Sequence, residues 1–172
     1  LRGLKGSLHE GGVREPTVVR WPAGIKPGRR SDLTSGFEDW LLTFADLAGV
    51  KPSGPSTGES LVPTLKGEAQ ARAHPLYREF PGYGHQQAIW DGKWKAIRTE
   101  MLKQLNQTGK VVTQLYDLEA DPAEAHDLAA QFPEVVKVLE AKMAAARQPN
   151  PKFPVAGLDP LPEGKGKKKS AK

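Results

Sequence analysis

The 172-residue chain contains no cysteine, which excludes a disulfide framework and thiol chemistry. It has no apolar run near the roughly 18–20 residues that a membrane-spanning helix needs, so no membrane span is predicted. No secretory signal is visible, and the first residue is Leu1 rather than methionine. These absences exclude two kinds of chemistry and architecture but leave the compartment of the protein open.

Apolar residues make up only 38% of the chain, diluted by 15 prolines and 18 glycines. The four Trp, five Phe and three Tyr residues are nevertheless enough to anchor one ordinary core, with irregular chain around it.

Most of the net charge of +5 comes from the end of the chain. There, a single acidic residue, Glu163, is outnumbered by Lys165, Lys167, Lys168, Lys169 and Lys172. Because no aromatic residues alternate with these lysines, a solvated tail is favoured over a specific nucleic-acid site.

The first half of the chain predicts one strand and one main helix. Residues 17–21 are β-rich and end at Pro22, which predicts a strand. A capping-box pattern and a following glycine predict a helix that begins between residues 35 and 39 and ends at 48. Its apolar residues share one face, which predicts a buried stripe of Phe37, Leu41, Phe44, Ala45 and Ala48. A single helical turn is expected over residues 61–65.

The second half predicts a small antiparallel sheet and a packed helix. Strands are expected at residues 76–80, 87–90, 93–98 and 112–118. The dipeptide Asp91-Gly92 predicts a two-residue hairpin turn, with Trp90 partly exposed. The helix is expected over 133–147, with an apolar stripe of Val135, Leu139, Met143 and Ala146.

Two other stretches of this half carry local signals. Residues 103–110 are expected to form a polar loop. Asp121, Pro122 and Glu124 are interpreted as the N-cap, N1 and N3 residues of a helix start rather than as a calcium loop, because their spacing does not fit an EF-hand.

The N-terminal motif carries the main chemical signal. Lys5 stands beside Gly6 and is followed by the run Glu10-Gly11-Gly12, then Arg14 and Pro16. Glycines allow a backbone to approach a ligand closely. A lysine held in such a loop is a compact cation suited to an oxyanion such as sulfate or phosphate.

This motif resembles the GKGS/T-x-x-EGG-x-R-x-P block of the formylglycine-dependent sulfatases. The resemblance continues in family order. Residues 19–28 are similar to RWPGxIKPG, and Gly92 to Lys95 read as the GKWK strand. Further blocks lie at residues 39–49, 58–67 and 115–129. Six blocks in the family's order and spacing are far more specific than any single one.

The resemblance implies that the chain is the C-terminal part of a longer sulfatase. The chain has no CxPSR or SxPSR motif and no Asp-Asn dipeptide, so the formylglycine nucleophile and the ligands of a divalent cation, calcium in most relatives, are expected outside it. The implied fold class is α/β (α+β). Residues 1–70 would be a remnant of an alkaline-phosphatase-like α/β domain, residues 71–148 an antiparallel sheet plus helix, and residues 149–172 a disordered tail.

The resemblance also assigns roles to single residues. Lys5 is expected to contact the sulfate group as the catalytic cation. His85 and His9 are candidates for substrate binding. Glu10 and Arg14 are expected to pair and to orient Lys5 from behind. No metal ligand is predicted within the chain.

The function implied is hydrolysis of a sulfate ester, of a sulfated sugar or an aryl sulfate, with the 172 residues inactive alone. One alternative is a phosphate-ester or phosphonate hydrolase of the same superfamily. Another is a noncatalytic binding module that uses the basic tail. By the same resemblance, the expected compartment is periplasmic, secreted or lysosomal.

Overall fold

A computed structural model of the protein describes residues 1–160. The chain divides into two compact units. One contains Leu1–Val13, Tyr77–Ile89 and the chain from Lys93 onward, and the other contains Arg14–Leu76 and Trp90–Gly92. The N-terminal segment up to Val13 thus groups with the sheet, whereas the sequence predicts it with residues 14–70. None of the helices within residues 1–160 is long and apolar enough to cross a bilayer.

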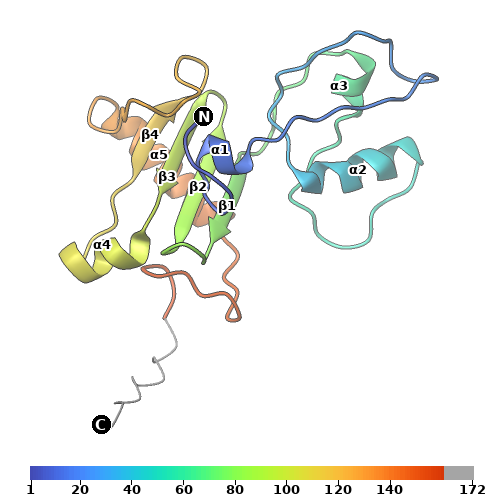
Figure 1. Ribbon diagram of the computed structural model, residues 1–172. Coiled ribbons are helices and arrows are strands. Elements are labelled where there is room, and N and C mark those ends of the chain that lie inside the picture. Colours follow the sequence, from blue (N-terminus) through green and yellow to red (C-terminus); the bar gives the residue numbers. More distant parts are fainter. Residues whose placement is uncertain (161–172) are drawn as a thin grey trace, which may run out of the picture. The chain divides into compact units, whose positions relative to one another are not determined.

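A four-stranded antiparallel sheet, in the order β1-β2-β3-β4, is the centre of the first unit (Figure 1). Its strands are β1 (Leu76–Phe80), β2 (Gln86–Asp91), β3 (Trp94–Arg98) and β4 (Gln114–Asp117), which confirms the four predicted strands. The hairpin turn lies at residues 92–93, one residue later than predicted. Trp90 is buried rather than partly exposed, because β2 is covered on both of its faces along its first five residues.

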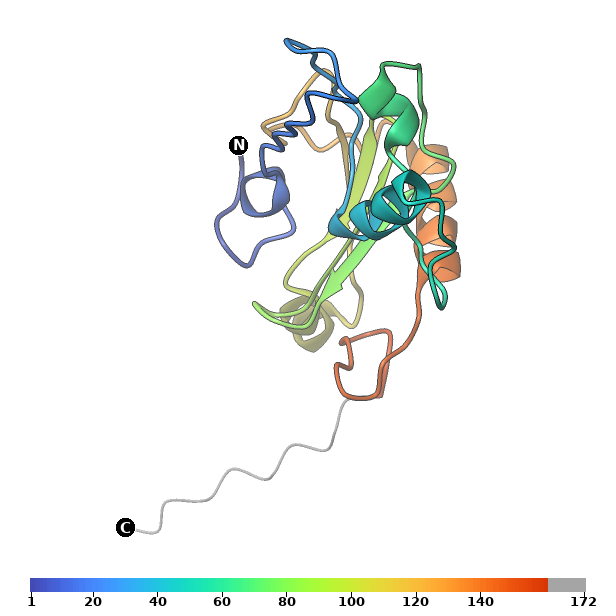
Figure 2. The ribbon, with the colours of Figure 1, turned by 90° about the vertical axis from the view of Figure 1, so that its right-hand side faces the viewer.

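The two faces of this sheet carry different covers. Helix α5 (Pro133–Ala146) lies on one face, and the short helix α1 (Glu10–Val13) lies on the other (Figures 1 and 2). The apolar core under α5 consists of Ile89, Ala96, Leu115, Leu139 and Met143. The predicted stripe of α5 is therefore confirmed at its two central positions. Side chains alternate along β3, so Lys95, between Trp94 and Ala96, points away from α5.

Two segments that were predicted to be irregular are ordered. Residues 101–108 form helix α4 (Met101–Thr108) rather than a polar loop. Its first residue, Met101, is fully buried, and Leu105 follows one helical turn later. In the predicted tail, Val155 and Ala156 are fully buried, so its described part packs on the first unit. The rest of the predicted tail, residues 161–172, lies outside the described residues.

The second unit contains α2 (Phe37–Leu47) and α3 (Val62–Lys66), which confirms the predicted main helix and helical turn. Residues 17–21 form no strand, because no segment within residues 1–160 pairs with them. The predicted buried face of α2 is confirmed only at Ala45, since Phe37, Leu41 and Phe44 are exposed.

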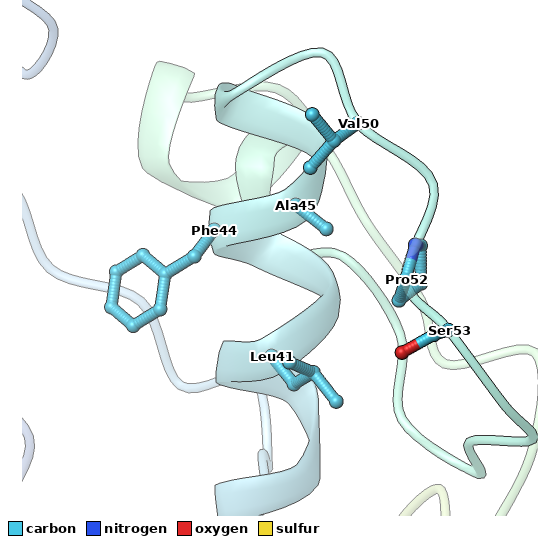
Figure 3. Close-up of a pocket in the computed structure, with 6 residues that line it drawn as sticks. All are labelled: Leu41, Phe44, Ala45, Val50, Pro52 and Ser53. Atoms are coloured by element: carbon cyan, nitrogen blue, oxygen red, sulfur yellow. The ribbon is translucent and has the colours of Figure 1, made fainter.

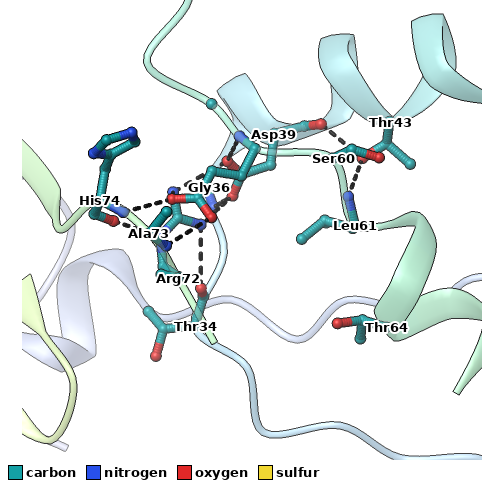
Figure 4. Close-up of polar contacts among 12 residues, drawn as sticks. Thr34, Gly36, Asp39, Thr43, Ser60, Leu61, Thr64, Arg72, Ala73 and His74 are labelled. Atoms are coloured by element: carbon teal, nitrogen blue, oxygen red, sulfur yellow. Dashed lines mark hydrogen bonds and ion pairs between the residues drawn. The ribbon is translucent and has the colours of Figure 1, made fainter. Parts of the chain in front are cut away.

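Polar residues of α2 point inward instead, because they find buried partners (Figure 4). The hydroxyl of Thr43 accepts a hydrogen bond from the Leu61 amide at 2.9 Å. The carboxylate of Asp39 accepts hydrogen bonds from Arg72 at 2.7 Å and from the Glu59 amide at 2.8 Å. On its exposed side α2 borders a shallow hollow of about 380 Å³, lined by Leu41, Phe44, Ala45, Val50, Pro52 and Ser53 (Figure 3).

Candidate functional site

The N-terminal loop owes its shape to glycines that touch backbone. A β-carbon on Gly11 would lie 2.5 Å from the carbonyl oxygen of Gly3, and one on Gly12 would lie 2.2 Å from that of Ser7. Real side chains do not tolerate either separation. The amide of Gly11 also donates to the carbonyl of Arg2 at 2.6 Å. The loop is therefore closed on itself, and Lys5 lies exposed on it.

Gln86 fixes this loop from the sheet. Its side-chain amide donates to the carbonyl of Gly6 at 2.8 Å and accepts from the amide of Leu8 at 3.0 Å. The glutamine belongs to β2 and is almost fully buried. Because both bonds go to backbone on either side of Ser7, they fix the path of the chain just after Lys5.

A buried charge cluster lies between this loop and β3. The ammonium group of Lys95 is 2.9 Å from Glu10 Oε1 and 2.8 Å from Glu124 Oε1. The side chains of Lys95 and Glu124 have no exposed surface, and that of Glu10 is nearly buried. Charges removed from water in this way need close partners of opposite sign. The amide of Glu10 also donates to Glu124 Oε2 at 2.7 Å, so the cluster holds the start of α1.

His9 completes the cluster. Its Nδ1 lies 3.1 Å from Glu124 Oε1, and its ring meets the ring of Tyr116 edge-on at 6.2 Å between centroids. Burial by itself raises the pKa of Glu124. The hydrogen bonds from His9 and Lys95 and the Lys95 charge outweigh it and hold that pKa below its usual range. Glu124 is thus a buried ion, and its interpretation as a capping residue is wrong because no helix begins there.

The structure brings Lys5, His9 and Glu10 together in one loop of the first unit. Glu10 pairs with Lys95, a residue that sequence reasoning missed. The one available signal was a lysine between Trp94 and Ala96 in a strand buried on both faces. Arg14 begins the second unit, so its predicted pairing with Glu10 stays a prediction.

His85 lies in the loop between β1 and β2 and is half-buried. Its Nδ1 accepts a hydrogen bond from the Ala156 amide at 2.9 Å. The neutral ring therefore carries its proton on Nε2, which is a donor. Within residues 1–160, no group of three or more histidine, aspartate or glutamate side chains is placed to hold a metal ion.

Residues 5–149 match the family model described as "N-sulphoglucosamine sulphohydrolase, C-terminal". N-acetylgalactosamine-6-O-sulfatase of Bacteroides thetaiotaomicron is 31% identical over 158 residues, which cover 85% of this chain and 30% of that protein. Human (Homo sapiens) arylsulfatase A is 32% identical over 188 residues, which cover 93% of this chain and 37% of that protein. The chain thus spans about a third of the length of these curated relatives.

Solved structures agree with the sequence relatives. A sulfatase structure from glycosaminoglycan metabolism in Bacteroides thetaiotaomicron is 29% identical with a TM-score of 0.66, covering 84% of this chain and 31% of that one. A second solved structure, of a protein in complex with its substrate D-glucosamine-2-N,6-O-disulfate, is 25% identical with a TM-score of 0.59, covering 74% of this chain and 27% of that one. The chain therefore belongs to the N-sulphoglucosamine sulphohydrolase C-terminal family, and it has the fold of the C-terminal region of alkaline-phosphatase-like sulfatases.

Proposed function

We propose that this chain is the C-terminal part of a sulfatase, a sulfuric ester hydrolase that acts on a sulfated saccharide. The family match and the sulfatase relatives support this proposal. The observation that carries it is the position of Lys5, exposed on a loop that Gln86 and the buried cluster of Lys95, Glu10 and Glu124 hold from behind.

Lys5 acts as a fixed cation in this proposal. As the sulfate ester bond breaks, negative charge grows on the sulfate and on the leaving oxygen. A positive charge that is already in place stabilises this charge without the cost of reorganising solvent. The tight glycine turns and the two Gln86 bonds hold the backbone that carries Lys5.

The neighbouring candidates have different roles. The Nε2–H group of His85 is a donor for a sugar hydroxyl or the leaving oxygen. Glu10 supports the Lys5 loop from behind through Lys95. His9 is buried against Glu124, which supports an orienting role for it over direct contact with substrate.

In this proposal, the nucleophile and the metal ligands lie in parts of the full-length protein outside these 172 residues. By the family resemblance, a formylglycine elsewhere in the full-length protein would supply the nucleophile, and a divalent cation, expected to be calcium, would supply polarisation of the sulfate. The described residues offer no ligand cluster for such an ion. The 172 residues alone are therefore expected to be inactive. An extracytoplasmic compartment, periplasmic, secreted or lysosomal, also stays a prediction.

The test replaces Lys5 in the full-length protein that carries this chain. With 4-nitrophenyl sulfate, Lys5→Ala is expected to lower kcat/KM by about 10²–10³, the usual cost of losing one group that stabilises transition-state charge. Lys137→Ala is the matched control, because Lys137 is an exposed lysine on α5, across the sheet from the loop. The control should keep wild-type kcat/KM.

Two results would contradict the proposal. One is a Lys5→Ala enzyme with kcat/KM within threefold of wild type, roughly 0.7 kcal/mol or less in transition-state binding. The other is a wild-type protein that hydrolyses 4-nitrophenyl phosphate faster than the sulfate, which favours the phosphate-ester alternative.

A further inference from the structure

An aromatic residue that the proposed function does not use stands directly beside the Lys5 loop. Tyr83, in the loop between β1 and β2, is 70% exposed. A β-carbon on Gly6 would lie only 2.1 Å from Tyr83 Cε2, so the tyrosine ring rests on the backbone of the residue that follows Lys5. Gly6 has a φ of +86°, which lets it present its bare side to the ring.

A second aromatic ring extends this surface. The ring of Phe80, at the end of β1, lies 6.1 Å from that of Tyr83 at an interplanar angle of 34°. It is 36% exposed, so both rings are open to solvent. Paired rings at this separation form a continuous apolar face with negative π density above it.

The backbone beneath Tyr83 is strained and yet firmly held. Tyr83, Gly84 and His85 have φ values of +50°, +79° and +67°, although two of the three are not glycine. The carbonyls of Gly84 and His85 accept hydrogen bonds from the first amides of α4, at 3.0 and 3.1 Å. Ala156 binds the His85 ring. Such over-determined strain is typical of ligand-binding segments.

We propose that Tyr83, together with Phe80, forms the subsite for the sugar ring that carries the sulfate ester. This inference depends on the proposed function, because Lys5 must bind the sulfate for the ring to lie here. A pyranose has an apolar C–H face whose hydrogens are attracted to an aromatic π face. Its sulfate would then reach the adjacent lysine. Tyr83 is thus a specificity-determining residue for sulfated saccharides.

The experiment separates recognition of the ring from recognition of the sulfate. The full-length protein hydrolyses 4-nitrophenyl sulfate, with N-acetylgalactosamine 6-sulfate and inorganic sulfate as competing inhibitors. Tyr83→Asn removes the ring, and asparagine tolerates positive φ, which limits the loss of folding. It is expected to raise the inhibition constant of the sugar sulfate about tenfold, equivalent to ~1.4 kcal/mol of stacking. The constant for inorganic sulfate should stay within twofold.

Two controls accompany it. Tyr83→Phe keeps the ring and should keep both inhibition constants. Phe132→Ala removes another exposed aromatic, which packs against Trp94 on the α5 side of the sheet, and should also leave both constants unchanged. Thermal melting of each variant shows whether it is folded.

The outcomes distinguish the two proposals. Equal losses for both inhibitors in a folded Tyr83→Asn protein, or no loss for either, overturn the sugar subsite. Absence of inhibition of the wild-type protein by the sugar sulfate also overturns it. If Lys5→Ala leaves binding of inorganic sulfate intact, the proposed function fails first, and the subsite fails with it.

Discussion

Lys95 is the residue on which the polar interior of the first unit depends. Its ammonium group has no exposed surface and lies within 3 Å of two carboxylates, those of Glu10 and Glu124. Two carboxylates and one ammonium group, with His9 beside them, are thus buried away from bulk solvent. Each ion depends on the others, because none can be solvated alone.

Replacing Lys95 by methionine should therefore destabilise the first unit strongly. Lys95→Met keeps most of the side-chain volume but leaves two buried carboxylates without their cation, at a cost of about 3–5 kcal/mol. The midpoint of urea unfolding, followed by tryptophan fluorescence, measures this loss.

Lys93→Met is the matched control. The ion pair of Lys93 with Asp117 is 2.5 Å long, but its lysine is 44% exposed. Water already screens such a pair, so the control should lose less than about 1 kcal/mol. Equal losses for the two variants would show that burial of Lys95 does not decide its contribution.

At the scale of elements, α2 shows how a buried ion can override an apolar pattern. Asp39 is fully buried, caps the Gly36 amide at 2.7 Å and binds Arg72. One carboxylate thus connects the start of α2 to the segments at residues 59 and 72 (Figure 4).

Asp39→Asn should detach these segments from one another. An asparagine keeps the shape but removes the closer of the two carboxylates that face Arg72, leaving only that of Glu59 at 3.8 Å, at a cost of about 3 kcal/mol. Limited proteolysis within residues 48–74, compared between wild type and variant, measures the local opening. Asp32→Asn is the control, because the Asp32–Arg30 pair is exposed, and it should behave as wild type.

The elements that sequence patterns predicted best are those whose partners are close in the chain. The four strands and α5 were predicted because alternation, the Asp91-Gly92 turn and Pro133 are local signals. The exposed face of α2 and the missing strand at 17–21 were mispredicted. Their outcome depends on distant partners such as Arg72, or on a neighbouring strand that does not exist within residues 1–160.

The same distinction applies to the candidate site. Lys5 and its loop could be predicted from a motif within 16 residues of chain. The cluster behind the loop could not, because Lys95 is 85 residues from Glu10 and Glu124 is 114 residues from it. Glu124 in addition fitted a plausible local capping pattern, which concealed its buried position.

At the scale of the whole molecule, both compact units contain a buried carboxylate with a lowered pKa. Burial raises the pKa of Asp39 and of Glu124, but the lowering by Arg72 in one unit and by His9 and Lys95 in the other is larger. In the unfolded chain the two groups return to ordinary values of 3.8 and 4.5. Below these values the unfolded chain binds more protons than the folded one, so acid favours unfolding.

The stability of the protein should therefore fall on acidification. The contribution of Glu124 is complete above pH 4.5 and is lost as the pH falls through the lowered folded-state value. The free energy of unfolding, measured by urea titration from pH 7 to pH 3, should show this decline. Glu124→Gln should be less stable at pH 7 and should have a flatter pH dependence. A variant curve parallel to wild type over this range would refute the assignment.

The position of Lys95 also has a consequence for how β3 finds its place during folding. Lys95 is paired with Tyr116 across β4, and Ala96 with Leu115. A slip of one residue would exchange the two faces of β3. It would place the ammonium group of Lys95 in the apolar core under α5 and the methyl group of Ala96 beside two carboxylates. Any pairing slipped by an odd number of residues would suffer both penalties at once. Lys95 thus favours the correct register of β3 against β4 while the sheet forms.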